Sequence, residues 1–186
     1  MRRASLSVKL PYSKTIFSVP KNLDIIGTMN TADRSVEALD TALRRRFEFE
    51  EMLPNSSLLS KIKCDNIDLE KLLNTINKRI EKLLDKDHQI GHSYFMNSDG
   101  ILSISDLRYI FKNKILPLLQ EYFYGDFGKI GLVLGERFIK EKDDNTVFSK
   151  FNYDDLDLID ERKVYQLSNL NNLESKDFES IYKISE

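Results

Sequence analysis

Alternating apolar and polar side chains near the start of the chain indicate β-structure. Residues 5–10 and 15–19 both alternate in this way and are separated by residues 11–14 (Pro-Tyr-Ser-Lys), so they predict a β-hairpin. Residues 23–28 are mostly apolar and lie between Pro20 and a polar cluster, which is typical of a strand buried on both faces. A hairpin and one central strand of a sheet are therefore expected here.

After residue 28 the apolar spacing becomes that of helices. Ser35 is in the position of an N-cap, apolar residues then recur every three or four positions, and three arginines follow at 44–46. A short strand is expected over residues 47–52, which are followed by Pro54.

The longest periodic segments lie in the middle of the chain. Apolar residues recur at helical spacing over 68–85 and over 105–124, where Pro117 is expected to kink or split the helix. A shorter helix is predicted over 127–134, between glycines. Residues 65–140 are therefore expected to form a compact helical unit, followed by a polar tail with weak strand and helix signals.

Composition and charge limit the classes of function. With 41% apolar residues among 186, the chain can fill a core, and because no apolar run of membrane-spanning length is present, a cytoplasmic location is expected. Cys64 is the single cysteine, so neither an internal disulfide nor a cysteine metal cluster is expected. Basic residues outnumber acidic ones nine to six over 1–50, whereas acidic residues lead twelve to six over 141–186. No clustered basic face for binding DNA alone is therefore expected.

A polar cluster follows the predicted central strand. Residues 22–49 read NLDIIGTMNTADRSVEALDTALRRRFEF. In open α/β sheets, ligands bind beyond the carboxyl ends of the strands, so Asn30 can reach a bound phosphate or its attacking water. Consecutive helical residues point about 100° apart, and therefore the three arginines at 44–46 do not all share one target. One or two of them can project toward a neighbouring subunit.

These residues also have structural interpretations. Asn, Thr, Asp and Ser favour turns and caps, and arginines at a helix C-terminus are stabilised by the helix dipole. His92 would then be a structural histidine and His88 an exposed one. Cys64 has no partner motif that would make it a nucleophile.

The string GTMNTADRS followed by ALRRRF resembles the signature of McrB, the nucleotide-hydrolysing subunit of methylcytosine-specific restriction systems, and of its AAA+ relatives. The likeness is strongest over residues 8–54, continues through IGHSYF at 90–95 and the helix at 115–124, and fades in the tail. It implies that Asn30 is the sensor-1 residue, which positions the water that attacks the γ-phosphate. Arg45 and Arg46 would be the candidate arginine fingers for the neighbour's nucleotide, with the choice between them open.

The same resemblance implies further binding residues, cofactors and partners. Thr28, Asp33 and Arg34 would belong to the signature loop near the nucleotide, and His92 would lie near the base or phosphates. The nucleotide would be GTP or ATP with Mg²⁺, held mostly by residues outside this sequence, and no metal ligand is expected within it. Homologous AAA+ subunits in a ring and an McrC-like nuclease subunit would be the partners, with DNA reached indirectly through other domains and no membrane involved.

The expected fold is α/β. A partial AAA+ parallel-sheet core, consisting of C-terminal strands with a hairpin, is predicted over 1–55. An α-helical lid is predicted over 56–140 and an acidic, mixed tail over 141–186.

The sequence also departs from the family. The phosphate-cradling motif G-x-x-x-x-G-K-[ST] does not occur among its 186 residues, and no Asp or Glu precedes Leu23, where an acidic Mg²⁺-binding strand would end. Residues 156–161 (LDLIDE) imitate that acidic motif but come after the lid, so they are interpreted as a solvated edge. The sequence is therefore not expected to hydrolyse nucleotide alone, as a truncated or split AAA+ subunit would not. A non-catalytic assembly or decoy subunit, or a decayed remnant, is the alternative.

Overall fold

The computed structural model describes residues 7–20, 22–30, 45–143, 146–150, 154 and 162–183. They fall into two compact units, which are divided between Phe47 and Glu48.

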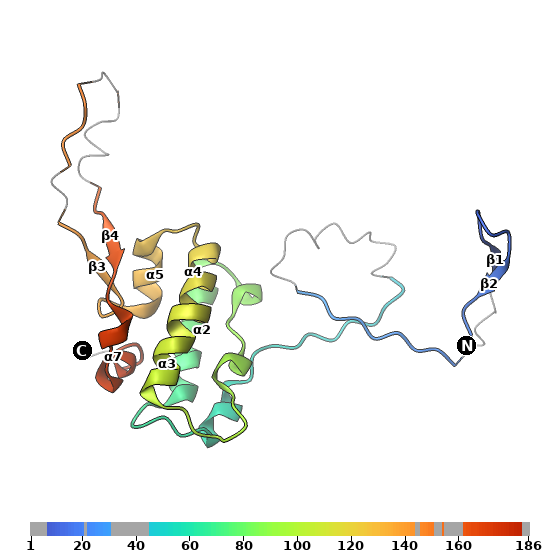
Figure 1. Ribbon diagram of the computed structural model, residues 1–186, viewed down its shortest axis with the longest axis horizontal. Coiled ribbons are helices and arrows are strands. Elements are labelled where there is room, and N and C mark those ends of the chain that lie inside the picture. The colour runs from blue at the N-terminus through green and yellow to red at the C-terminus, as the bar shows by residue number, and fades with distance from the viewer. Residues whose placement is uncertain are drawn as a thin grey trace. The chain divides into compact units, whose positions relative to one another are not determined.

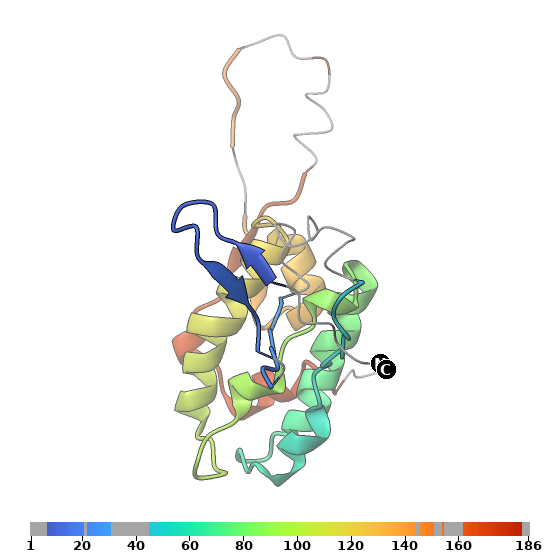
Figure 2. The same cartoon turned by 90° about the vertical axis from the view of Figure 1, so that its right-hand side faces the viewer.

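The first unit contains the predicted hairpin. β1 (Ser7–Lys9) pairs antiparallel with β2 (Ile16–Ser18), as the blue arrows of Figure 2 show. Val8 lies opposite Phe17 in the register. Lys14 closes the connection with a left-handed φ of 58°. The hairpin prediction is confirmed, and both described strands lie within the ranges predicted for them.

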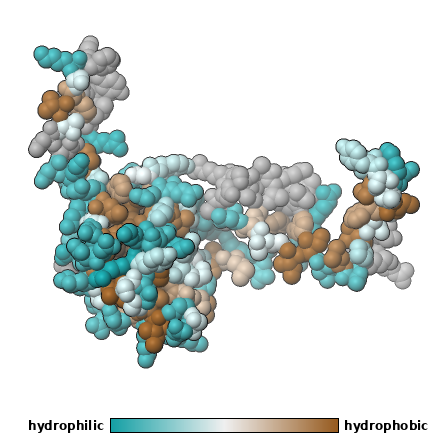
Figure 3. Space-filling model, viewed as in Figure 1, coloured by the Kyte–Doolittle hydropathy of each residue, from teal (hydrophilic) through white to brown (hydrophobic). Residues whose placement is uncertain are grey.

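The two single strands predicted nearby are wrong. Residues 22–30 have no regular secondary structure, and Leu23, Ile25 and Ile26 are 47%, 67% and 95% exposed. Residues 47–52 are also irregular and exposed. A central strand needs neighbours on both edges for its hydrogen bonds and its burial, and no strand among the described residues pairs with either segment. Apolar side chains consequently recur on the surface of the extended N-terminal segment in Figure 3.

In the second unit a 3₁₀ helix (Ser56–Lys61) precedes the longest described helix, α2 (Leu69–Leu83), which was predicted over 68–85. Asp68 caps it by accepting a hydrogen bond from the Lys71 amide at 3.0 Å. The hydrogen bonds of this cap lower the pKa of the Asp68 carboxyl. The buried face of α2 consists of one polar and five apolar residues, namely Leu69, Leu72, Leu73, Ile76, Asn77 and Ile80.

The predicted helix at 105–124 forms with an irregularity before Pro117. α3 (Ile104–Ile110) starts with a capping box between Ser103 and Asp106 and continues through a π-helical turn into α4 (Leu116–Tyr122). In that turn the Leu116 amide donates to the carbonyl of Phe111, five residues earlier. Pro117 has no N–H for the carbonyl four residues before it, which explains why the regular α-helical ladder is interrupted here.

A tight turn connects α4 to α5 (Phe127–Leu134) and uses Gly125 at a φ of 75°, a conformation that glycine adopts without strain. Asp126 then caps α5 by accepting from the Lys129 amide at 3.1 Å. The shorter helix predicted at 127–134 is confirmed. After α5, β3 (Ile139–Glu141) pairs antiparallel with β4 (Tyr165–Leu167), so that residues distant in sequence lie side by side (Figure 1).

Four phenylalanines bring the elements of this unit together. The Phe111 ring lies 6.3 Å from Phe95, 5.4 Å from Phe138 and 5.1 Å from Phe178, measured between centroids, and all four side chains are fully buried. Phe178 comes from α7 (Ser175–Glu179), within the segment that was predicted as a tail. The end of the described chain is therefore part of the helical core.

The described sheets are the two antiparallel pairs β1–β2 and β3–β4, which together with the helices make the chain mixed α/β. The parallel-sheet core stays a prediction, as do the domain boundaries at 55 and 140. No described helix is long and apolar enough to cross a membrane.

Candidate functional site

Thr28 and Asn30, the first of the predicted nucleotide-site residues, lie in the irregular segment 22–30, and both are exposed. The strand expected to carry them is not formed, so their predicted place beyond a strand's carboxyl end is not reproduced. Asp33 and Arg34 lie outside the described residues. The assignment of these residues to a nucleotide site stays a prediction.

The two candidate arginine fingers, Arg45 and Arg46, are exposed and lie in a turn at 45–47. The predicted helix before them, and Arg44 with it, lies outside the described residues. An exposed guanidinium is accessible to a phosphate held by another polypeptide, which is what an arginine finger requires. The choice between these two arginines stays open.

The signature string at 90–95 belongs to a loop at 85–95 in the second unit. Its centre is held by Asn77 of α2, whose side chain forms two hydrogen bonds with the backbone of Ile90. The Asn77 amide donates to the Ile90 carbonyl at 2.9 Å, and its oxygen accepts from the Ile90 N–H at 2.7 Å. Both groups are buried, so these bonds fix the loop in place. The apolar spacing of α2 did not identify Asn77, although a polar residue on a buried helical face is the signal that could have done so.

His92 begins a 3₁₀ turn (His92–Phe95) two residues after Ile90, and is half-buried. Its Nδ1 accepts a hydrogen bond from the backbone N–H of Asn55 at 3.1 Å. This nitrogen therefore carries no proton, and the neutral ring must carry its proton on Nε2. His92 thus has a definite structural contact, and its predicted position near a nucleotide stays untested.

His88 is more buried than the sequence suggested. Its Nδ1 lies 2.7 Å from Oδ1 of Asp85, its ring meets Tyr122 edge-on with centroids 4.8 Å apart, and its side chain is 18% exposed. The hydrogen bond to His88 lowers the pKa of the Asp85 carboxyl, while burial raises the pKa of Tyr122 to about 12. The prediction of an exposed histidine was wrong because α4 lies against the 3₁₀ turn that carries it.

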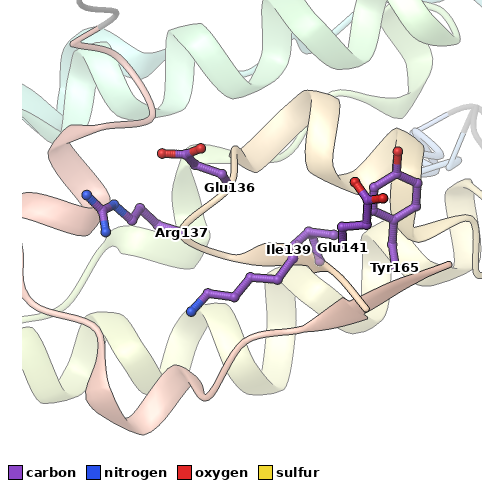
Figure 4. Close-up of a pocket in the computed structure, with 6 residues that line it drawn as sticks. Glu136, Arg137, Ile139, Glu141 and Tyr165 are labelled. Atoms are coloured by element: carbon purple, nitrogen blue, oxygen red, sulfur yellow. The ribbon is translucent and has the colours of Figure 1, made fainter. Parts of the chain in front are cut away.

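An open groove of about 440 Å³ runs along β3. Figure 4 shows Glu136 and Arg137 at one end of it and Glu141 and Tyr165 at the other. Arg137 lies 3.8 Å from Asp177, and Glu141 pairs with a lysine of the opposite chain segment at 2.9 Å. The lining charges are of both signs and partly neutralised, so the groove does not select one class of charged ligand.

Cys64 is buried, with 1% exposure, and burial raises the pKa of its thiol to about 11. The thiol is therefore protonated at neutral pH, as expected of a passive side chain. The acidic residues 156–161 lie outside the described residues.

Comparison with known proteins identifies the second unit. A sequence-family model described as McrB, alpha-helical lid domain, matches residues 68–131. The chain is 41% identical over 144 residues to the Type IV methyl-directed restriction enzyme EcoKMcrB subunit of Escherichia coli (strain K12), covering 67% of this chain and 31% of that relative. It is 30% identical over 116 residues to the Type II restriction enzyme BsuMI component YdiS of Bacillus subtilis (strain 168), covering 57% and 32% respectively.

Residues 68–131, which contain α2, α3, α4 and most of α5, are thus a helical lid domain. The similarity to the Escherichia coli subunit extends over more of the chain than these residues, and the chain is an McrB-like protein. It spans about a third of the length of the two relatives.

Proposed function

We propose that this chain supplies the C-terminal part of an AAA+ core and the lid of a nucleotide-hydrolysing, McrB-like subunit of a restriction system. The observation that carries the proposal is the match of α2 to α5 to the McrB lid, together with similarity to two restriction-system proteins. A lid domain has a function only beside a nucleotide-binding core. The segment before the lid, with GTMNTADRS and ALRRRF, is where that core would continue.

In this proposal Asn30 is the sensor-1 residue, and Arg45 or Arg46 reaches the nucleotide of a neighbouring subunit. A guanidinium that arrives at the transferred phosphate neutralises charge that develops in the transition state. The exposure of both arginines supports a role in trans, because a solvent-accessible side chain can be reached by another subunit.

GTP or ATP with Mg²⁺ would be the cofactor. The sequence has no phosphate-cradling loop, so polypeptide outside these 186 residues must hold the phosphates and the metal. A ring of homologous subunits and an McrC-like nuclease are the partners that the proposal requires, with DNA bound by other domains.

Reconstitution tests the proposal. The chain alone should hydrolyse neither GTP nor ATP, and it should gain activity when combined with a polypeptide that carries the P-loop and acidic strand of an McrB-like core. Replacing the arginine that serves as the finger with alanine should lower kcat by about 10³-fold or more, whereas Arg162→Ala, at another exposed arginine, should not. The proposal fails if the combined, folded polypeptides remain inactive, or if neither Arg45→Ala nor Arg46→Ala lowers kcat.

The exposed apolar residues of the first unit favour a second candidate, a non-catalytic assembly or decoy subunit. Val8, Ile16 and Phe17 are 57%, 79% and 51% exposed, which is typical of a surface that another polypeptide covers. Mixing the chain with an intact McrB-like enzyme should then lower the turnover of that enzyme in proportion to the chain added. Unchanged turnover at saturating excess would exclude this role.

A further inference from the structure

The connecting segment, residues 48–55, joins the turn that carries Arg45 and Arg46 to the helical lid. We propose that Lys86 and His92 are positioning residues, which hold the connecting segment against the lid and so restrict the chain that carries the two arginines. The first part of this inference is independent of the proposed function, whereas the second part rests on it.

Two contacts attach the connecting segment. Nζ of Lys86 lies 2.5 Å from Oε1 of Glu51, and Nδ1 of His92 accepts from the N–H of Asn55 at 3.1 Å. Lys86 and His92 lie on either side of Ile90, the residue whose backbone Asn77 holds by two buried hydrogen bonds. Both contacts therefore come from the loop at 85–95, which Asn77 holds in place. While both are formed, the course of the connecting segment along this loop is fixed.

Apolar burial does not hold the connecting segment. Its large apolar side chains Phe49, Met52 and Leu53 are 54%, 93% and 52% exposed. Burial of a large apolar side chain is normally the main stabilising contribution, so in its absence the polar contacts decide where the segment lies. Each contact is exposed, and we expect each to favour the attached state by a factor of roughly two to five.

Asn55, the last residue of the connecting segment, is held in place by the 3₁₀ helix that follows it. Asn55 accepts from the Ser57 amide at 3.2 Å and so caps the next 3₁₀ turn, and the Ser56 hydroxyl donates to Asn74 of α2 at 2.7 Å. Replacing His92 therefore removes one contact of Asn55 but leaves its cap in place. A loss of attachment can thus be separated from a loss of fold.

Chain connectivity extends the effect to the arginines. Arg46 precedes Glu51 by five residues, which span at most about 18 Å when fully extended. With Glu51 attached, the Arg46 backbone can move only within that radius of Glu51, and with Glu51 released the tether begins at Asn55. Attachment therefore reduces the volume that the guanidinium can occupy before it binds a phosphate. Because this positions a catalytic group, attachment should raise kcat more than it lowers KM.

The attachment is tested by NMR on the full chain. Nitrogen shifts of His92 should report the tautomer with the proton on Nε2, and His92→Ala should speed exchange of the Asn55 amide roughly two- to fivefold. His92→Asn, which keeps an acceptor oxygen, should retain most of the protection. Protonation of Nδ1, or an Asn55 amide unaffected by His92→Ala, would overturn this contact.

A charge swap tests the ion pair. Lys86→Glu should lower the ¹⁵N order parameters of residues 49–53, and adding Glu51→Lys in the same chain should restore them. Lys163→Glu is the matched control, because it breaks a similarly exposed ion pair, with Glu141 at 2.9 Å, elsewhere in the second unit. Equal order parameters in wild type and Lys86→Glu would refute the role of Lys86.

The positioning role is tested in the reconstituted enzyme. Lys86→Glu and His92→Ala should each lower kcat roughly two- to fivefold with little change in KM, and the charge swap and His92→Asn should restore it. An unchanged kcat in variants whose segment NMR shows to be released would overturn the positioning role. If the wild-type assembly does not hydrolyse nucleotide at all, the proposed function fails, while the NMR results still decide whether the segment is attached.

Discussion

Replacement of Asn77 by leucine tests whether its two hydrogen bonds with Ile90 stabilise the lid. The two side chains are similar in size, so the change removes polar groups without leaving a large cavity. It leaves the N–H and the carbonyl of Ile90, now bonded at 2.7 and 2.9 Å, buried without partners. An unsatisfied buried group costs about 1–3 kcal/mol. The additional apolar surface of leucine offsets part of that cost, so we expect a loss of about 2–4 kcal/mol in the free energy of unfolding.

Urea unfolding of the full chain, followed by far-UV circular dichroism, measures this difference. The midpoint should fall with an unchanged m-value, because the surface exposed on unfolding stays the same. Asn77→Asp keeps an acceptor for the Ile90 N–H but loses the amide donor to its carbonyl and places an ionisable group in a buried site, so it should also lower the midpoint. Asn113→Leu makes the same substitution at an exposed site, where the amide donates to the Tyr109 carbonyl, and should cost less than about 1 kcal/mol. If the free energy of unfolding of Asn77→Leu is within about 0.5 kcal/mol of the wild-type value, or is no lower than that of Asn113→Leu, the stability of the loop does not depend on Asn77.

Three further predictions concern stability. Phe178→Ala should destabilise the second unit by about 3–5 kcal/mol in urea unfolding, and a wild-type midpoint would show that α7 is not part of the cooperative core. Asp68→Ala should cost about 1 kcal/mol while Asp68→Asn costs less, because asparagine also caps helices; equal losses would contradict the cap. The native Cys64 thiol keeps its proton up to about pH 11 instead of its usual 9.0, so its contribution is fully present below pH 9 and is lost as the pH rises through 11. Cys64→Ala should flatten the fall in stability across that interval, and parallel pH profiles of the two proteins would refute the shift.

Three helical segments of the second unit, α2, α5 and the run from α3 to α4, were predictable because the apolar spacing within each segment shows which of its faces is buried. In α2 the apolar residues recur along one face, which is buried together with Asn77, and this spacing can be read whatever element covers that face. The same holds for α5 and for the run from α3 to α4, where Pro117 also indicated an interruption. A proline restricts its own backbone locally, and therefore its effect can be read without knowledge of the fold.

The two single strands failed for the opposite reason. The apolar run at 23–28 contains the residues of a buried strand, but strand formation depends on edges that other segments provide. The hairpin at β1–β2 succeeded because both of its strands and their connection are contiguous in the sequence.

The sequence alone thus determined the hairpin, the lid's periodic helices and the signature strings that indicate an McrB-like protein. Only the tertiary structure decided which distant residues meet. In the structure Phe178 packs against Phe111 of the lid, and Asn77 forms hydrogen bonds with the backbone of Ile90. Nδ1 of His92 accepts a hydrogen bond from the N–H of Asn55. Local propensity and periodicity act over a few residues, whereas these contacts join positions from 13 to 67 residues apart and depend on how the whole chain packs.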